Sequence, residues 1–68
     1  MEKYQLTEMG EYQITGRRWK GPIPDGMLLN YLLHKGWTPE LEEELRTNDE
    51  WRGYFRRLFE AGYIEKVD

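Results

Sequence analysis

The chain has 68 residues, a formal net charge of −3 and no cysteine. This length predicts one domain spanning residues 1–68, and the lack of cysteine excludes disulfides and metal sites built on thiolates. The mildly acidic balance gives no overall attraction to nucleic acid. No run of apolar residues reaches transmembrane length, and residues 1–10 lack the apolar stretch that is typical of a signal peptide. We therefore expect a cytoplasmic protein without a membrane partner.

The N-terminal third predicts a strand, a short helix and a loop. Residues 4–6 alternate in polarity, as strands do. Thr7 is a suitable N-cap for a helix over residues 8–14, in which Gly10 is unfavourable. Two glycines and two prolines fall within residues 16–24, a density that no helix sustains and that predicts a loop.

The next predicted helix starts with Asp25 as its N-cap and ends before Gly36. Its apolar residues occupy much of the helix circumference, which predicts the most buried helix of the domain. These residues are Leu28, Leu29, Tyr31, Leu32 and Leu33. Gly36 stands at the C′ position, where a positive φ is often required.

Thr38 and Pro39 mark the start of a third helix, because threonine caps well and proline in the first turn loses no hydrogen bond. Leu41 and Leu45 give this helix one narrow apolar stripe, and its remaining faces are predicted to lie in water.

Asn48 or Asp49 caps a fourth helix, expected over residues 49–61 and ended by Gly62. Its apolar residues follow the helical period: Trp51, Phe55, Leu58 and Phe59. Residues 63–67 alternate in polarity and predict a terminal strand.

The end of the fourth helix carries a recurrent pattern: Leu58, three residues, Gly62 and the apolar pair Tyr63-Ile64. With the helices at 28–32 and 38–41, it resembles the winged-helix DNA-binding domains of bacterial and archaeal transcription regulators. The resemblance covers residues 27–67. The segment YQLTEMG (residues 4–10) is similar to one that follows the wing in those regulators but here precedes the first helix.

A circularly permuted arrangement follows from this order, in which strand 4–6 pairs with strand 63–67. The resemblance implies a mainly α fold with a small β element. It consists of a winged-helix-like three-helix core, a short N-terminal helix and a two-stranded sheet that joins the N- and C-terminal strands.

The resemblance also implies that helix 49–61 is a recognition helix lying in a DNA major groove. Trp51, Phe55 and Leu58 then face the core. The candidate nucleic-acid-binding residues on the solvent side are Arg52, Tyr54, Arg56 and Arg57. Arginine binds guanine or phosphate, and tyrosine contacts the DNA backbone. The structural alternative is that these arginines are solvated and pair with Glu50 and Glu60.

The loop after the first helix supplies a second candidate set, Arg17, Arg18 and Lys20, around Trp19. Three cations and an indole ring suit phosphate or minor-groove binding. In the alternative interpretation, Trp19 packs beneath the loop into the core while the three cations stay in water.

Acidic residues in the third helix and the following turn argue against DNA, because the equivalent helix crosses the DNA backbone. They are Glu40, Glu42, Glu43, Glu44, Asp49 and Glu50. Two hypotheses therefore stay open. One is a DNA-binding regulator or accessory factor that acts as a homodimer on duplex DNA. The other is a protein-interaction module on the same scaffold, without nucleic-acid binding.

No pattern in the sequence predicts catalysis. His34 is the single histidine and is expected to cap a helix or lie partly buried in a structural role. No nucleophile–base pair, metal-ligand cluster or phosphate-binding loop can be identified. We therefore expect no enzyme activity, no metal and no small-molecule cofactor.

Overall fold

Capping side chains fix where most of the helices begin. Thr7 Oγ1 accepts a hydrogen bond from the Gly10 amide at 3.1 Å, and Thr38 Oγ1 accepts one from Leu41 at 3.1 Å. Asn48 Oδ1 accepts one from Glu50 at 3.0 Å. These contacts satisfy first-turn amides that have no partner inside the helix, and they confirm the predicted caps.

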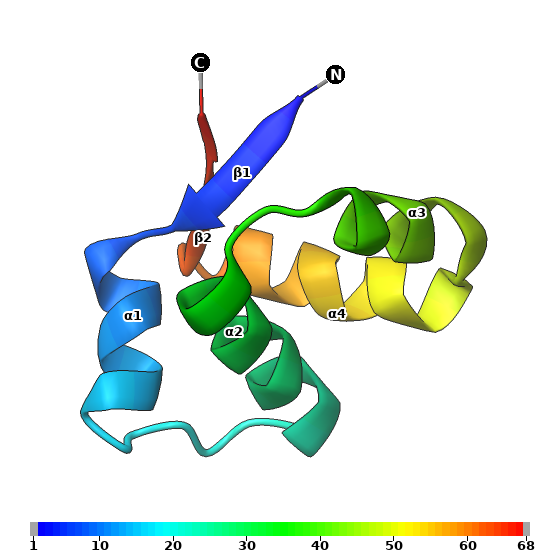
Figure 1. The fold of residues 1–68 in the computed structure, drawn as a ribbon. Helices are drawn as coiled ribbons and strands as arrows, with labels where there is room; N and C mark the ends of the chain where they lie inside the picture. Colours follow the sequence, from blue (N-terminus) through cyan, green and yellow to red (C-terminus); the bar gives the residue numbers. More distant parts are fainter. Residues whose placement is uncertain (1, 68) are drawn as a thin grey trace.

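The computed structural model describes residues 2–67, in which the elements follow the order β1, α1, α2, α3, α4, β2 (Figure 1). Their bounds are β1 Lys3–Leu6, α1 Glu8–Thr15, α2 Ile23–Lys35, α3 Pro39–Thr47, α4 Asp49–Glu60 and β2 Ile64–Val67. The fold is mainly helical with one small sheet, as the sequence predicts. Within residues 2–67, no helix combines the length and apolarity needed to span a bilayer.

Helix α2 begins earlier than expected, and Asp25 is not its cap. Pro22 occupies the N-cap position without a side-chain hydrogen bond, and Pro24 lies in the first turn. Proline is tolerated there because the first amides have no helical acceptor. Asp25 lies inside the helix with only 1 % of its surface exposed. The predicted loop 16–24 therefore ends at residue 22.

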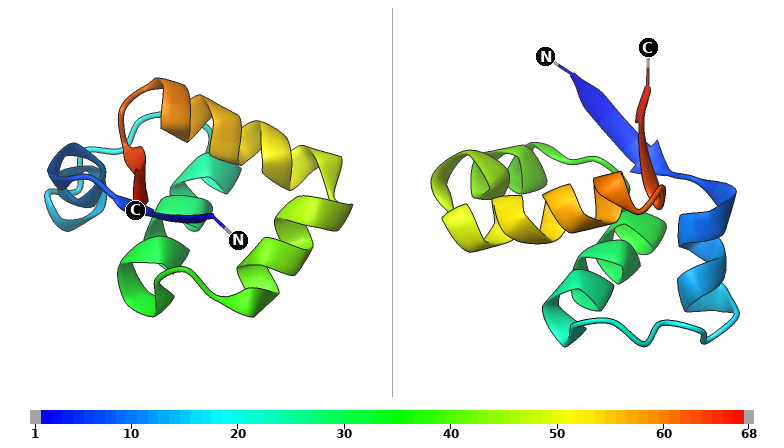
Figure 2. Two further views of the ribbon diagram at one scale, coloured as in Figure 1. Left: turned by 90° about the horizontal axis from the view of Figure 1, so that it is seen from above. Right: turned by 180° about the vertical axis from the view of Figure 1, so that it is seen from behind.

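The two ends of the chain form the sheet. Strand β1 pairs antiparallel with β2, in a register that places Lys3 opposite Val67 and Leu6 opposite Ile64. Thr7 extends the contact, since its amide donates to the Tyr63 carbonyl at 3.0 Å and its hydroxyl donates to the Gly62 carbonyl at 2.7 Å. Figure 2 shows the two strands side by side from two further directions. The predicted pairing of the terminal strands is confirmed.

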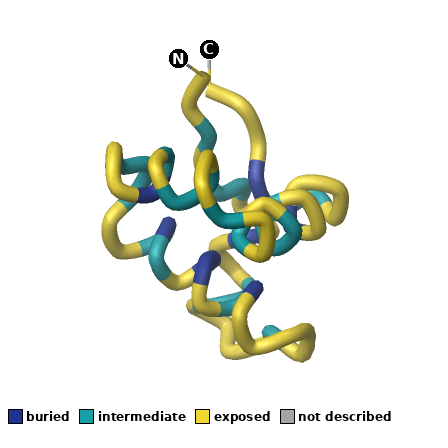
Figure 3. The backbone as a smooth tube through the Cα atoms, turned by 90° about the vertical axis from the view of Figure 1, so that its right-hand side faces the viewer, coloured by how far each residue is buried: buried dark blue, intermediate teal, exposed yellow. Residues whose placement is uncertain are grey.

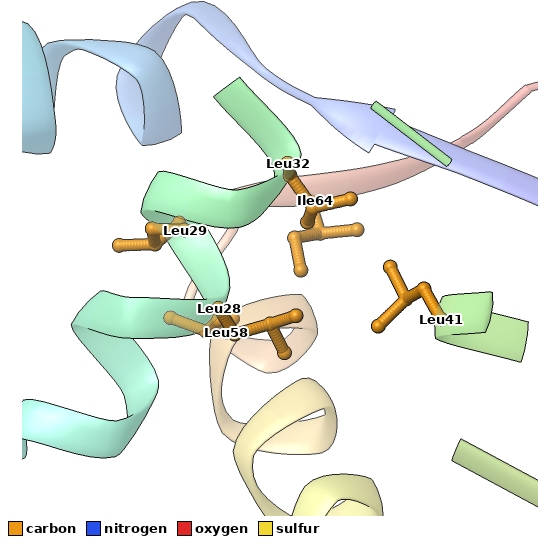
Figure 4. Close-up of a cluster of buried hydrophobic side chains, with 6 residues drawn as sticks. All are labelled: Leu28, Leu29, Leu32, Leu41, Leu58 and Ile64. Atoms are coloured by element: carbon orange, nitrogen blue, oxygen red, sulfur yellow. The ribbon is translucent and has the colours of Figure 1, made fainter. Parts of the chain in front are cut away.

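The core is a small cluster of aliphatic side chains in which α2 contributes most, as its composition predicts (Figure 4). Its members are Leu28, Leu29, Leu32, Leu41, Leu58 and Ile64. Helix α2 packs against both α1 and α4. Figure 3 shows that buried positions are few along the tube, so the core is small.

Two glycines in helices make a matched test of this packing. A Cβ built on buried Gly10 would collide with the backbone carbonyl of Tyr63. A Cβ on Gly53 meets only the Arg57 Nη1 atom, at 3.7 Å. We expect Gly10→Ala to lower the free energy of unfolding by about 1–3 kcal/mol through overpacking. Gly53→Ala is expected to raise it by about 0.5–1 kcal/mol through helix propensity.

The measurement is urea unfolding of both variants, followed by far-ultraviolet circular dichroism. A Gly10→Ala variant as stable as the parent protein would contradict the close approach of α1 to Tyr63.

Candidate binding surfaces

Arg52 is held by the helix that precedes it. Its Nη1 atom donates to the carbonyl oxygens of Leu45 at 3.0 Å and Arg46 at 2.9 Å. Its other terminal nitrogen pairs with Asp49. These carbonyls belong to the last turn of α3, where acceptors lack helical partners. Arg52 therefore joins the end of α3 to the start of α4.

Arg57 is held on a different side of α4. Its Nε and Nη2 atoms donate to the two carboxylate oxygens of Asp25, each at 2.7 Å. The Asp25 hydrogen bonds raise the pKa of the Arg57 guanidinium above its ordinary value. Two parallel charge-assisted bonds of this kind are both strong and directional. Since Asp25 is buried in α2, the pair fixes α4 against that helix.

Tyr54 does not face solvent as expected. It is half-buried against the core, and its ring lies 6.2 Å from that of Trp51. Residues 51, 54, 55 and 58 share one helix face at the i, i+3, i+4, i+7 spacing, which explains the burial. The guanidinium of Arg57 lies 5.5 Å from the Tyr54 ring centre.

Arg56 is the member of the predicted set on α4 that pairs with no other described residue. Among residues 2–67, no hydrogen bond or ion pair engages its side chain. Its neighbours at helical spacing on the outer face are Asp49, Gly53 and Glu60. Of the four predicted residues, the structure brings Arg52 and Arg56 together in the lining of one groove, whereas Arg57 pairs with Asp25 and Tyr54 packs against the core. The expected pairing with Glu50 and Glu60 is replaced by Arg52 with Asp49 and Arg57 with Asp25.

In the loop between α1 and α2, Trp19 and the three cations lie where the structural alternative predicts. Trp19 is half-buried against the core, where its Nε1 atom donates to the Pro22 carbonyl at 2.9 Å and its ring lies 5.7 Å from that of Tyr63. Arg17, Arg18 and Lys20 are exposed. The Arg18 guanidinium lies 5.5 Å from the Tyr12 ring centre.

A groove that the sequence did not reveal lies between β1, α3 and α4. Four rings converge there, and we call it the aromatic groove: Tyr4, Trp37, Phe55 and Phe59. Tyr4 is central, with ring centres 4.9 Å from Phe55, 5.3 Å from Trp37 and 5.9 Å from Phe59. The groove volume is about 1030 Å³. Phe59 is 43 % exposed, so it presents an apolar surface to solvent.

Charges of both signs surround the aromatic groove. Its lining includes four carboxylates, Glu2, Glu42, Asp49 and Glu60, and three guanidinium groups, Arg46, Arg52 and Arg56. Several of these charged groups already have hydrogen-bond or ion-pair partners inside the domain. Trp37 donates to Glu42 at 2.6 Å, and Lys66 lies 3.0 Å from Glu2, whose pKa it lowers by hydrogen bonding. Charges that nearly balance do not concentrate a ligand of either sign.

His34 lies exposed in the last turn of α2, so the partly buried alternative of the two roles expected for it is wrong. Across residues 2–67, no group of three or more histidine, aspartate or glutamate side chains is placed to hold a metal ion.

Comparison with known proteins gives one informative similarity. The chain is 42 % identical over 60 residues to a glutamate–tRNA ligase of Natranaerobius thermophilus. The matched region covers 88 % of this chain and 10 % of the ligase, so the chain spans about a tenth of that relative's length. No family model and no solved structure matches the chain.

Removal of the Arg57 guanidinium isolates the contribution of the buried ion pair. Arg57→Met leaves the buried Asp25 carboxylate without its half-exposed partner, and we expect the free energy of unfolding to fall clearly below that of the parent protein. Arg56→Met is the matched control, and we expect a change within about 0.5 kcal/mol. The double variant Asp25→Leu with Arg57→Met should recover much of the loss, because no charge is then buried.

Urea titrations of the four proteins, read by tryptophan fluorescence, measure these differences. Equal stability of Arg57→Met and Arg56→Met would contradict a structural role for the pair.

Proposed function

We propose that this chain is a protein-interaction module whose aromatic groove receives a bulky apolar side chain from a peptide segment of another protein. The observation that carries the proposal is the convergence of Tyr4, Trp37, Phe55 and Phe59 on one open groove. Buried aromatic contacts of this kind supply much of the binding energy in protein interfaces.

The charges around the groove support a peptide over a nucleic acid. A phosphate backbone entering the groove would meet four carboxylates beside three guanidinium groups, so repulsion and attraction nearly cancel and the groove gives no net attraction to it. Arg52 is already bonded to α3 and Asp49. A peptide that inserts an apolar side chain needs no net charge in the groove. Its binding removes apolar ring surface from water.

The similarity to part of a glutamate–tRNA ligase supports an accessory role. A unit like this chain forms a small part of that longer protein, as expected of a module that works beside other domains. We propose that this chain binds without catalysing a reaction, and that it does so in the cytoplasm. The order of α2, α3, α4 and β2, with β1 beside β2, supports a permuted winged-helix scaffold.

Duplex DNA is the second candidate ligand, and the exposed cations favour it. Arg17, Arg18 and Lys20 of the loop, and Arg56 of α4, form no ion pair with another described residue. Phosphates would bind to these side chains, and a homodimer would double the number of contacts.

The groove is tested with peptides selected from a random phage-displayed library against the folded domain. We expect selected peptides to share an aromatic or leucine anchor and to bind with micromolar affinity. Phe59→Ser should weaken their binding at least about tenfold, since a central apolar contact is typically worth more than 1.4 kcal/mol. Phe59 is partly exposed, so the substitution is expected to leave the fold intact, which circular dichroism verifies.

Ile23→Ser, on the far exposed end of α2, is the control and should bind the peptides as the parent protein does. Selected peptides that bind Phe59→Ser and the parent protein equally would refute the groove as the binding site.

DNA binding is measured by fluorescence anisotropy of labelled mixed-sequence duplex. If DNA is the ligand, affinity should fall by orders of magnitude between about 50 and about 200 mM salt, and Arg17→Ala with Arg18→Ala should weaken it. If the interaction module is the correct description, the duplex should not bind at the lower salt concentration.

A further inference from the structure

A second groove runs along α2, on elements separate from the aromatic groove. We call it the α2 groove, and its volume is about 660 Å³. Ile14 of α1 and Trp19 of the loop line one part, and Ile23 and Met27 of α2 line another. Ile23 is 78 % exposed and Met27 64 %, the highest values among the large hydrophobic side chains of residues 2–67. Apolar side chains left this open on a folded domain indicate an interaction surface.

The floor of the α2 groove is built into the fold. The Trp19 ring lies so close to the backbone of α2 that a Cβ on Gly26 would come within 2.6 Å of its Cδ1 atom. The Nε1 atom of Trp19 is bonded to the Pro22 carbonyl, and its ring meets Tyr63 edge to face. The indole is therefore held in place before any ligand arrives, which lowers the entropy cost of binding.

The charge around this groove is of one sign. Its charged or titratable lining residues are His34 and Lys35, and none of the described residues that line it is acidic. The adjoining loop adds Arg17, Arg18 and Lys20 in exposed positions. These basic residues lie close together on a chain whose net charge is −3. The charged residues of the groove and of the adjoining loop are thus cationic, opposite in sign to the net charge of the chain, and they attract an anionic ligand.

We propose that the α2 groove binds an acidic amphipathic peptide segment of another protein, with apolar side chains on Ile23 and Met27 and carboxylates toward the loop cations. The proposal does not depend on the function assigned to the aromatic groove. A linked partner that reached both grooves would gain affinity from the two contacts together.

Other occupants fit less well. A second copy joined through the same groove by two-fold symmetry would place like charges opposite one another. Duplex DNA offers phosphates to the loop cations but has little to cover Ile23 and Met27. A flat anionic bilayer surface cannot fill a concave floor formed by Trp19 against Gly26.

The probe is a fluorescently labelled peptide of about 15 residues, with leucines at i, i+3, i+4 and i+7 and glutamates elsewhere. A matched peptide carries lysine at every glutamate position. We expect the acidic peptide to bind in the micromolar range and at least about tenfold more tightly than the basic one, because each lost charge contact weakens it. Higher salt should reduce the difference.

Ile23→Ser with Met27→Ser should weaken the acidic peptide at least about tenfold. Both side chains are largely exposed, so the domain is expected to remain folded. Met9→Ser is the control and should bind the acidic peptide as the parent protein does, because Met9 is 53 % exposed and is not among the residues that line either groove. Amide chemical-shift changes should map to Trp19, Ile23 and Met27, and not to Phe59.

Equal binding of the two peptides, or no binding of either, would overturn the proposal. So would retention of affinity in the Ile23→Ser, Met27→Ser variant. Binding of mixed-sequence duplex DNA or of phosphatidylserine vesicles with loss in that same variant, without binding of the acidic peptide, would assign the groove to those ligands instead.

Discussion

The pairing of the two chain ends is the constraint on which the other features depend. Strands β1 and β2 are four residues each, and within residues 2–67 neither has another strand as a neighbour. A two-stranded sheet is only marginally stable by itself. It persists here because Ile64 enters the core and Thr7 ties the start of α1 to Gly62 and Tyr63. The same pairing carries Tyr4 to the face of α4, where it completes the aromatic groove.

The buried ion pair between Asp25 and Arg57 changes the interpretation of the charged residues on α4. The charge of an arginine on an amphipathic helix makes it a candidate binding residue, but the hydrogen bonds that it makes decide its role. The hydrogen bonds of Arg57 join α4 to α2, and those of Arg52 join α4 to α3. These contacts orient α4 between its neighbours, whereas no hydrogen bond or ion pair within residues 2–67 engages Arg56. Arg52 and Arg57 thus carry structural contacts that their sequence positions do not indicate.

The two grooves differ in a way that makes separate partners physically reasonable. The aromatic groove is surrounded by charges of both signs that are partly satisfied within the domain, so apolar contact dominates its recognition. The α2 groove combines exposed aliphatic side chains with bases alone, so electrostatic attraction adds both affinity and selectivity. Because they lie on different helices, substitutions in one serve as controls for the other. The small size of the domain fits such use, since its thin core leaves much apolar surface near solvent.

The sequence by itself determined most of the local structure. The caps at Thr7, Thr38 and Asn48 were predictable because a single side chain satisfies nearby backbone amides. The same holds for the helix ends at Gly36 and Gly62, whose φ values of 73° and 87° favour glycine. The burial of α2 was predictable from its apolar composition. The pairing of strand 4–6 with strand 63–67 was predicted from the resemblance to winged-helix domains.

Only the tertiary structure decided which side chains act together. Asp25 has the sequence context of a cap, yet its partner is Arg57, 32 residues away. Tyr4 becomes a neighbour of Phe55 because the terminal strands pair, and Trp37, just before α3, becomes one because α3 packs against α4. Local hydrogen bonds depend on neighbours in the chain, whereas ion pairs and grooves depend on how separate elements pack. The candidate binding surfaces of this protein therefore depend on how its separate elements pack.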